Sequence, residues 1–174
     1  MLKVTPLTPS IGAIISKVSL NKDLNSGTIE KIYSALIKHQ VVFFRDQNIS
    51  PETHLKLAES FGEIDPGHPV YPHVEGFQSI VLLKNDENSK PDTNDWHKDL
   101  TFKPNPPFAS ILHGVKVPKV GGDTLWASMS AAYDQLPNGW KDHLEELEAI
   151  HDMGTFRNDF YKEGGIDSVN NALK

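Results

Sequence analysis

The sequence predicts a mixed α/β domain that is mainly antiparallel β, a barrel or jelly roll with helices packed outside it. Short β-prone segments dominate the middle of the chain, and no regular helices separate them. A parallel doubly wound sheet, in which strands and helices alternate, therefore fits poorly. Antiparallel barrels and jelly rolls are built from short strands of this kind. The length of 174 residues suits one domain, 1–174, with a substantial core.

The first sixty residues alternate between strand and helix patterns. Residues 1–20 are β-rich, and the apolar run 41–44 predicts a buried strand. Ser50 and Pro51 predict a helix N-terminus, and Gly62 predicts the end of that helix. Between the two strand regions, from Thr28 onward, apolar residues recur at helical spacing and predict one amphipathic helix face: Ile29, Ile32, Tyr33, Leu36 and Ile37.

The rest of the chain is predicted to contain a loop, several strands and a helical tail. Prolines and glycines predict a loop over 63–76, which is followed by strand-like residues 79–83 and 108–117. A Gly-Gly turn then leads to Thr124 on a further strand. Helical spacing returns near the end, with three residues on one apolar face: Trp140, Leu144 and Leu147.

Composition excludes several classes of function. The formal net charge is −6 and no basic run is present, so we expect no nucleic-acid partner. No apolar stretch is long enough to span a bilayer, and residues 1–6 lack the apolar core of a signal peptide. The chain has no cysteine, which excludes disulfides, thiolate metal sites and a cysteine nucleophile. These features predict a cytoplasmic protein without a membrane partner.

The most informative motif is His97 and Asp99, an imidazole and a carboxylate two residues apart. On an extended segment both side chains project to the same side. Together they could supply two of the three ligands of a 2-His-1-carboxylate site for non-heme Fe(II). Any His-x-Asp tripeptide satisfies this pattern, however. Taken alone, the pair is better explained as a chance pair on a solvated loop.

Two further runs carry candidate binding groups. Thr124 offers a hydroxyl that could anchor a carboxylate of a small acid, although, taken alone, it is better explained as a threonine hydrogen-bonded within a sheet. His68 and Tyr71 could grip an anionic head group, the alternative being a polar loop without a ligand. The aromatic neighbours Trp96 and Phe102 could limit water access to His97 and Asp99, or could simply be core residues.

Taken together, these runs resemble the α-ketoglutarate-dependent taurine dioxygenase family, which also contains 2,4-dichlorophenoxyacetate and alkylsulfate dioxygenases. The matches occur in family order along almost the whole chain, so together they are far more specific than any one motif. His151-Asp152 near the end also fits. The principal matching runs are Phe61-Gly62-Glu63-Ile64, His68-Pro69-Val70-Tyr71-Pro72-His73, Asn94-Asp95-Trp96-His97-Lys98-Asp99 and Gly121-Gly122-Asp123-Thr124-Leu125-Trp126.

The resemblance implies a double-stranded β-helix (jelly roll) with flanking helices, and it implies a role for each matching residue. His97 and Asp99 would ligate Fe(II), and Thr124 would bind a carboxylate of the cosubstrate α-ketoglutarate. No catalytic residue beyond the metal ligands is implied. The substrate would contact residues on several segments: His68, Tyr71, either Thr93 or Asn94, and Phe156, the last displaced by about one position from the family pattern.

The implied activity is hydroxylation of taurine or a related sulfonate at the carbon bearing sulfur, with Fe(II), α-ketoglutarate and O2. The products would be sulfite, an aldehyde, succinate and CO2. A same-fold dioxygenase for an alkylsulfate or aryloxy acid is the first alternative, and a non-catalytic fragment the second. The family's third iron ligand, a second histidine, and its arginine clamps have no counterpart up to Lys174, so we expect an N-terminal portion of a longer catalytic domain. A homo-oligomer is expected by family analogy.

Overall fold

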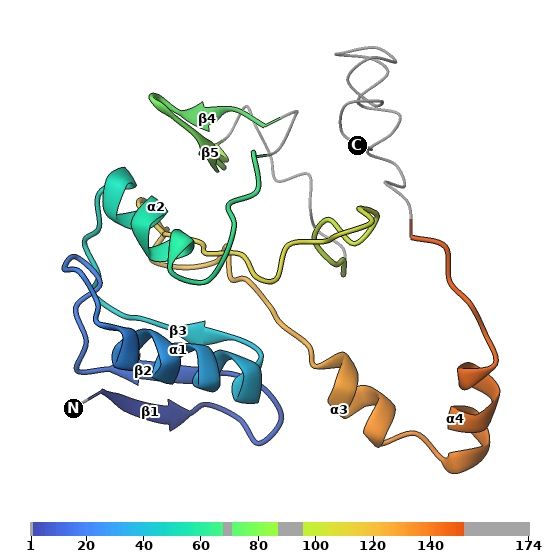
Figure 1. The fold of residues 1–174 in the computed structure, drawn as a ribbon. Coiled ribbons are helices and arrows are strands. Elements are labelled where there is room, and N and C mark those ends of the chain that lie inside the picture. Colours follow the sequence, from blue (N-terminus) through green and yellow to red (C-terminus); the bar gives the residue numbers. More distant parts are fainter. Residues whose placement is uncertain (1, 68–70, 87–95, 152–174) are drawn as a thin grey trace, which may run out of the picture. The chain divides into compact units, whose positions relative to one another are not determined.

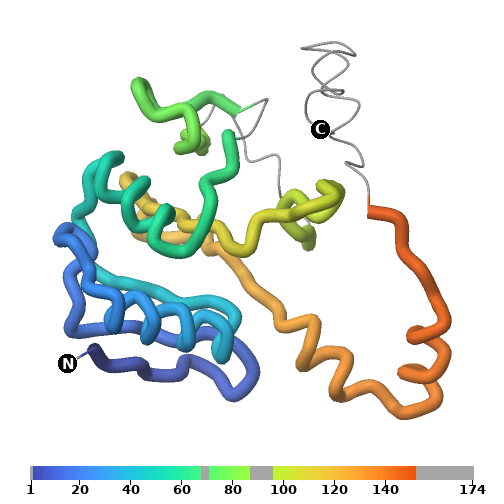
Figure 2. Tube along the Cα trace, viewed as in Figure 1, coloured from blue at the N-terminus to red at the C-terminus, as the bar shows by residue number. Residues whose placement is uncertain are grey.

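The computed structural model describes residues 2–67, 71–86 and 96–151 (Figure 1). The chain divides into two compact units, each of which is described by itself. The first comprises Met1–Phe61 and Ile111–Glu148, and the second comprises Gly62–Ser110 and Ala149–Lys174. Each unit therefore draws on two separate stretches of chain. The described residues can be followed by colour along the trace in Figure 2.

The first unit contains a three-stranded sheet. Strand β1 (Lys3–Pro6) pairs antiparallel with β2 (Ala13–Ser16), and β2 pairs parallel with β3 (Val42–Phe43). The turn between β1 and β2 closes where the Leu7 N–H donates to the Gly12 carbonyl over 2.9 Å. Gly12 has a φ of +90°, a conformation that favours glycine. The β-rich prediction for residues 1–20 is confirmed. The strand predicted over 41–44 is present as β3, but its predicted burial is wrong, because its residues are only partly buried.

Helix α1 (Ser26–His39) packs on the sheet (Figure 1). Its first turn is capped by the Asn25 side chain, which accepts a hydrogen bond from the Thr28 N–H over 2.9 Å. Ile32 and Ala35 are buried against Ile15 of β2 and form the main core cluster. The predicted helix is confirmed, but part of its predicted apolar face is wrong. The buried face is centred on Ile32 and Ala35, so Tyr33 and Ile37 turn outward and are exposed.

Helix α2 (Pro51–Glu59) begins as predicted, with Pro51 at its first position and the Ser50 hydroxyl accepting from the Thr53 N–H. It ends slightly before the predicted Gly62. Leu57 of this helix forms a second core cluster with Leu20 and Ile49. Burial of these aliphatic side chains is the main stabilising contribution to this part of the first unit.

Two short helices, α3 (Met129–Asp134) and α4 (Asn138–Glu145), also belong to the first unit. The buried Ser128 caps α3 by accepting a hydrogen bond from the Ala131 N–H over 3.1 Å. The predicted helical tail is therefore confirmed. Its predicted apolar face is not buried, because no described residue covers it: Trp140, Leu144 and Leu147 are exposed.

The second unit contains a hairpin of β4 (His73–Val74) and β5 (Phe77–Val81), paired antiparallel. Its turn includes Gly76, which has a φ of +79°. The strand predicted over 79–83 is thus present two residues earlier. The loop predicted over 63–76 is confirmed in its described part, except that its end forms β4.

The mixed α/β class is confirmed, but the described residues form no closed barrel. The strands predicted over 108–117 and around Thr124 are wrong for this structure, since neither segment is a strand. A strand needs a partner for its backbone N–H and C=O groups. No strand in the described part of the chain pairs with either segment. Their large apolar side chains are accordingly exposed, among them Val115, Val117 and Leu125.

Candidate metal-binding site

His97 and Asp99 lie close together in the second unit. The His97 Nε2 is 3.2 Å from the Asp99 Oδ1, and the two side chains are 55% and 65% exposed. Both residues lie outside regular secondary structure. Directly after them the chain turns at Leu100, which has a φ of +52°, and the Lys103 N–H donates to the Leu100 carbonyl over 3.1 Å. The structure thus brings both predicted ligands to the same side of one short segment.

The geometry of the pair fits two neighbouring ligands of one metal ion. Two donors that meet at a right angle on a first-row metal, each about 2.1 Å away, lie roughly 3 Å apart. The observed 3.2 Å is compatible with that separation, and it is also the distance of a direct contact between the imidazole and the carboxylate. An imidazole nitrogen and a carboxylate oxygen are also the donor types of the Fe(II) facial triad. Within the described ranges, no group of three or more such side chains gathers around one point.

Water access to this pair differs from the expectation. Trp96, predicted to shield the site or to join the core, is exposed in the structure, whereas Phe102 is partly buried. No described element packs over the Trp96 ring enough to bury it. His97 and Asp99 are therefore accessible to solvent.

Polar contacts from distant parts of the chain hold the turn that follows the pair. The Lys103 Nζ is 2.7 Å from the Asp65 Oδ2, and the Thr101 hydroxyl lies 3.0 Å from the His151 Nδ1. All four residues belong to the second unit. Sequence reasoning did not identify Asp65, Thr101 or Lys103. The partners are 38 and 50 residues apart, so no local spacing indicates them.

Thr124 lies in the first unit, after a turn in which Gly121 and Gly122 both have a positive φ, as predicted. Its segment is anchored two residues later by Trp126, whose ring packs edge-on against Phe43 of β3 at a centroid distance of 5.3 Å. The Thr124 side chain is exposed. It belongs to a different unit from His97 and Asp99, and each unit is described separately.

The predicted substrate-binding residues are only partly within the described ranges. Tyr71 is partly buried just before β4. The others lie outside the described residues: His68, Thr93, Asn94 and Phe156.

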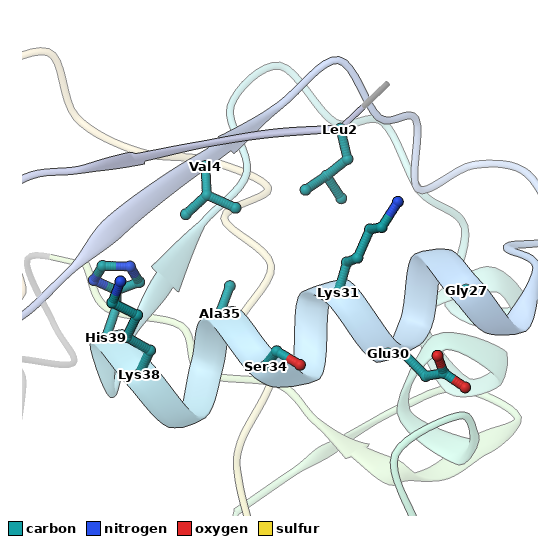
Figure 3. A pocket seen from close by; sticks show the side chains of 9 residues that line it. All are labelled: Leu2, Val4, Gly27, Glu30, Lys31, Ser34, Ala35, Lys38 and His39. Carbon is teal, nitrogen blue, oxygen red and sulfur yellow. The ribbon is translucent and has the colours of Figure 1, made fainter.

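A separate hollow of about 560 Å³ lies between β1 and α1 in the first unit (Figure 3). Leu2 and Val4 face the helix across it, and Lys31 and Lys38 line the helix side. The hollow contains no adjacent imidazole–carboxylate pair among the side chains that line it, so it offers no comparable metal site. In the described part of the chain, every helix is too short or too polar to cross a bilayer.

Comparison with known proteins identifies the family. Residues 3–171 match the family described as "Taurine catabolism dioxygenase TauD, TfdA family". An alkylsulfatase of Acinetobacter baylyi is 40% identical over 151 residues, covering 86% of this chain and 47% of that protein. An α-ketoglutarate-dependent sulfate ester dioxygenase of Pseudomonas putida is 38% identical, covering 86% of this chain and 49% of that protein.

A solved structure gives the same result. The crystal structure of a taurine dioxygenase from Burkholderia xenovorans is similar with a TM-score of 0.73 and 36% identity, over 83% of this chain and 51% of that one. The chain spans about half the length of the relatives it matches. It belongs to the TauD/TfdA family of taurine catabolism dioxygenases.

Proposed function

We propose that this chain carries part of the active site of an Fe(II)- and α-ketoglutarate-dependent dioxygenase, with His97 and Asp99 as two iron ligands. The observation that carries the proposal is the 3.2 Å separation of the His97 Nε2 and the Asp99 Oδ1. Two relatives, named as an α-ketoglutarate-dependent sulfate ester dioxygenase and an α-ketoglutarate-dependent sulfonate dioxygenase, support the same chemistry. When bound, Fe(II), α-ketoglutarate and O2 would supply the oxidising power for hydroxylation. The protein holds and orients the reactants.

The remaining roles are assigned by the family pattern. Thr124 would donate its hydroxyl hydrogen to a carboxylate of α-ketoglutarate. His68, Tyr71 and either Thr93 or Asn94 would hold the anionic end of the substrate, and Phe156 would line the pocket. By the family pattern, the third iron ligand and an arginine clamp for α-ketoglutarate would lie in the part of the family domain that this chain does not cover. A bidentate guanidinium suits that carboxylate better than a lysine does.

The substrate we propose is taurine or a related sulfonate, because the run His68–His73 matches the taurine dioxygenase pattern. A sulfate ester is the second candidate, favoured by the alkylsulfatase and the sulfate ester dioxygenase at 40% and 38% identity. Both classes present an SO3 group to the same kind of anion site. They differ in product, since hydroxylation next to the sulfur of a sulfonate releases sulfite and hydroxylation of a sulfate ester carbon releases sulfate.

The complete protein would close a double-stranded β-helix as a single domain. The exposed apolar side chains of residues 108–126 support this proposal, because pairing as strands with the remaining half of the fold would bury them. A cytoplasmic location and a homo-oligomer stay predictions.

The test uses the complete gene product that contains residues 1–174. Anaerobic addition of Fe(II) and α-ketoglutarate should give a visible charge-transfer absorption. Adding O2 with taurine, a second alkanesulfonate or an alkyl sulfate should give succinate, and the simultaneous release of sulfite or sulfate identifies the substrate class. No absorption and no succinate with any of these compounds would contradict the proposal and favour a non-catalytic protein.

A further inference from the structure

The turn from Leu100 to Lys103 begins one residue after Asp99, so its position fixes where the carboxylate and the neighbouring His97 can lie. The pair itself is largely exposed and has no regular secondary structure around it. Packing therefore contributes little to keeping the His97 and Asp99 side chains in a fixed relative position. Metal ligands need support from surrounding residues if their geometry is to be kept.

Lys103 and Asp65 form the stronger of the two contacts to this turn. Their charged atoms are 2.7 Å apart, and the side chains are only 20% and 27% exposed. The other lysine–aspartate pair described in this unit, Lys84 and Asp86, is longer at 3.6 Å and is 75% and 44% exposed. Exposed ion pairs contribute little because water and salt screen them. The shorter, more buried pair is a charge-assisted hydrogen bond that is screened less.

Asp65 also contacts the loop that precedes the hairpin. Its other carboxylate oxygen, Oδ1, accepts a hydrogen bond from the Gly67 N–H over 3.2 Å. Gly67 has a φ of +102°, and a Cβ at this position would lie 2.6 Å from the Gln78 carbonyl oxygen of β5. The glycine thus allows the loop to run directly against the strand. Lys103 consequently contacts, through Asp65, a loop segment that runs close to β5.

The second contact joins Thr101 to His151. The Thr101 Oγ1 and the His151 Nδ1 are 3.0 Å apart, and His151 comes from a stretch 50 residues further along the chain. The turn is therefore held at two positions, Thr101 and Lys103, by one residue that follows the turn in the sequence and one that precedes it. Two anchors restrict the rotation of a turn as well as its translation.

We infer that Lys103 and Thr101 are positioning residues, which hold the His97/Asp99 pair in metal-binding geometry through Asp65 and His151. This inference rests on the proposed function, since it assigns a role toward the same metal site. The Lys103–Asp65 contact is the main anchor, and the Thr101–His151 contact is the auxiliary one. Neither pair touches the metal.

The test measures Mn(II) affinity of the complete gene product by electron paramagnetic resonance, with Mn(II) standing in for Fe(II). Lys103→Met should weaken binding about tenfold, the lower end of what the loss of an outer-shell partner costs. Lys103→Arg should retain most of the affinity, because it keeps the charge. Lys84→Met removes the exposed ion pair in the same unit and should leave the affinity unchanged. Thr101→Val should give a smaller loss than Lys103→Met.

Asp65→Asn separates positioning from folding. It keeps an oxygen that can accept from the Gly67 N–H but removes the charge that Lys103 contacts. It should weaken Mn(II) binding as much as Lys103→Met, and the double variant should be no weaker than either single one. Thermal unfolding of each variant checks that the fold is retained. If Lys103→Met does not fold, Asp65→Asn decides the question.

The outcomes distinguish the inference from the proposed function. Wild-type protein that binds no Mn(II) would overturn both. Wild-type protein that binds Mn(II), with Asp65→Asn and Lys103→Met variants that bind it equally well, would overturn the inference and leave the proposed function intact.

Discussion

The core of the first unit and the proposed metal-binding segment of the second unit are held in place by different forces. Ile15 is 1% exposed and packs against Ile32 and Ala35. His97, in contrast, is 55% exposed, and the turn that follows Asp99 is held by polar side-chain contacts. Burial stabilises the first region, whereas the second presents reactive groups to solvent on a polar scaffold. Substitutions should therefore affect stability in one region and metal binding in the other.

The largest expected effect tests the second region. His97→Ala in the complete gene product should lower succinate formation at least about 100-fold, because loss of a direct ligand costs at least as much as loss of an outer-shell partner. The melting temperature should hardly change, because the side chain is exposed. Turnover with the sulfonate or sulfate substrate is the measurement. His143→Ala, at an exposed histidine of α4, is the control, and unchanged turnover in His97→Ala would rule out the ligand role.

The converse test concerns the core. Ile15→Ala should lower the free energy of unfolding by about 3 kcal/mol, because it leaves a cavity beside Ile32. Urea denaturation measures this loss. Ile37→Ala removes the same atoms from an exposed position of α1 and should change stability by less than about 0.5 kcal/mol. Equal effects of the two variants would contradict the buried face assigned to this helix.

A smaller effect is expected at the start of α2. Ser50→Ala removes the hydroxyl that accepts from the Thr53 N–H and should cost about 1 kcal/mol of unfolding free energy. The same urea titration measures it. Ser34→Ala, at an exposed position inside α1, provides a control that removes a hydroxyl without removing a cap. A loss in Ser34→Ala as large as that in Ser50→Ala would mean that the cap contributes nothing specific.

The two regions also differ in how far the sequence predicts them. Ser50 and Pro51 define a helix start locally, and the predicted helix differs from α2 only in ending slightly later. Tyr33 and Ile37 belong to the predicted apolar face but are exposed, because helical spacing alone does not say which side of a broad apolar stripe meets the sheet. The strand predicted over 108–117 needed a pairing partner, and pairing is a non-local property.

The candidate site, too, is predicted from the sequence only where its residues are close together in the chain. The His97 and Asp99 pair follows from a spacing of two, and the structure brings the two side chains together. The anchors at Asp65 and His151 lie 38 and 50 residues from their partners. A lysine, a threonine and an aspartate have no local pattern that distinguishes an anchor from a solvated surface residue. Only the three-dimensional arrangement identifies them.

The last prediction concerns a polar contact inside the first unit, whose core is otherwise held mainly by burial of aliphatic side chains. The His54 Nε2–H of α2 donates to the Ile111 carbonyl over 3.1 Å, and the His113 ring lies edge-on at 6.2 Å. Burial lowers the pKa of His54 below its ordinary value of 6.5. The hydrogen bond to Ile111 opposes that shift, and the charge of His113 adds to it.

The sign of the pH dependence follows from this shift. Between the lowered pKa of folded His54 and 6.5, the unfolded chain binds a proton that the folded chain does not. The free energy of unfolding should therefore fall as the pH drops through 6.5. Below the pKa of folded His54, protonation of this residue should cause no further decrease. Urea denaturation at about pH 7.5 and about pH 5.5 measures the difference. His54→Gln should reduce that difference, whereas His143→Gln should keep the wild-type slope. An unchanged pH dependence in His54→Gln would show that this partly buried histidine is not what couples the stability of the first unit to pH.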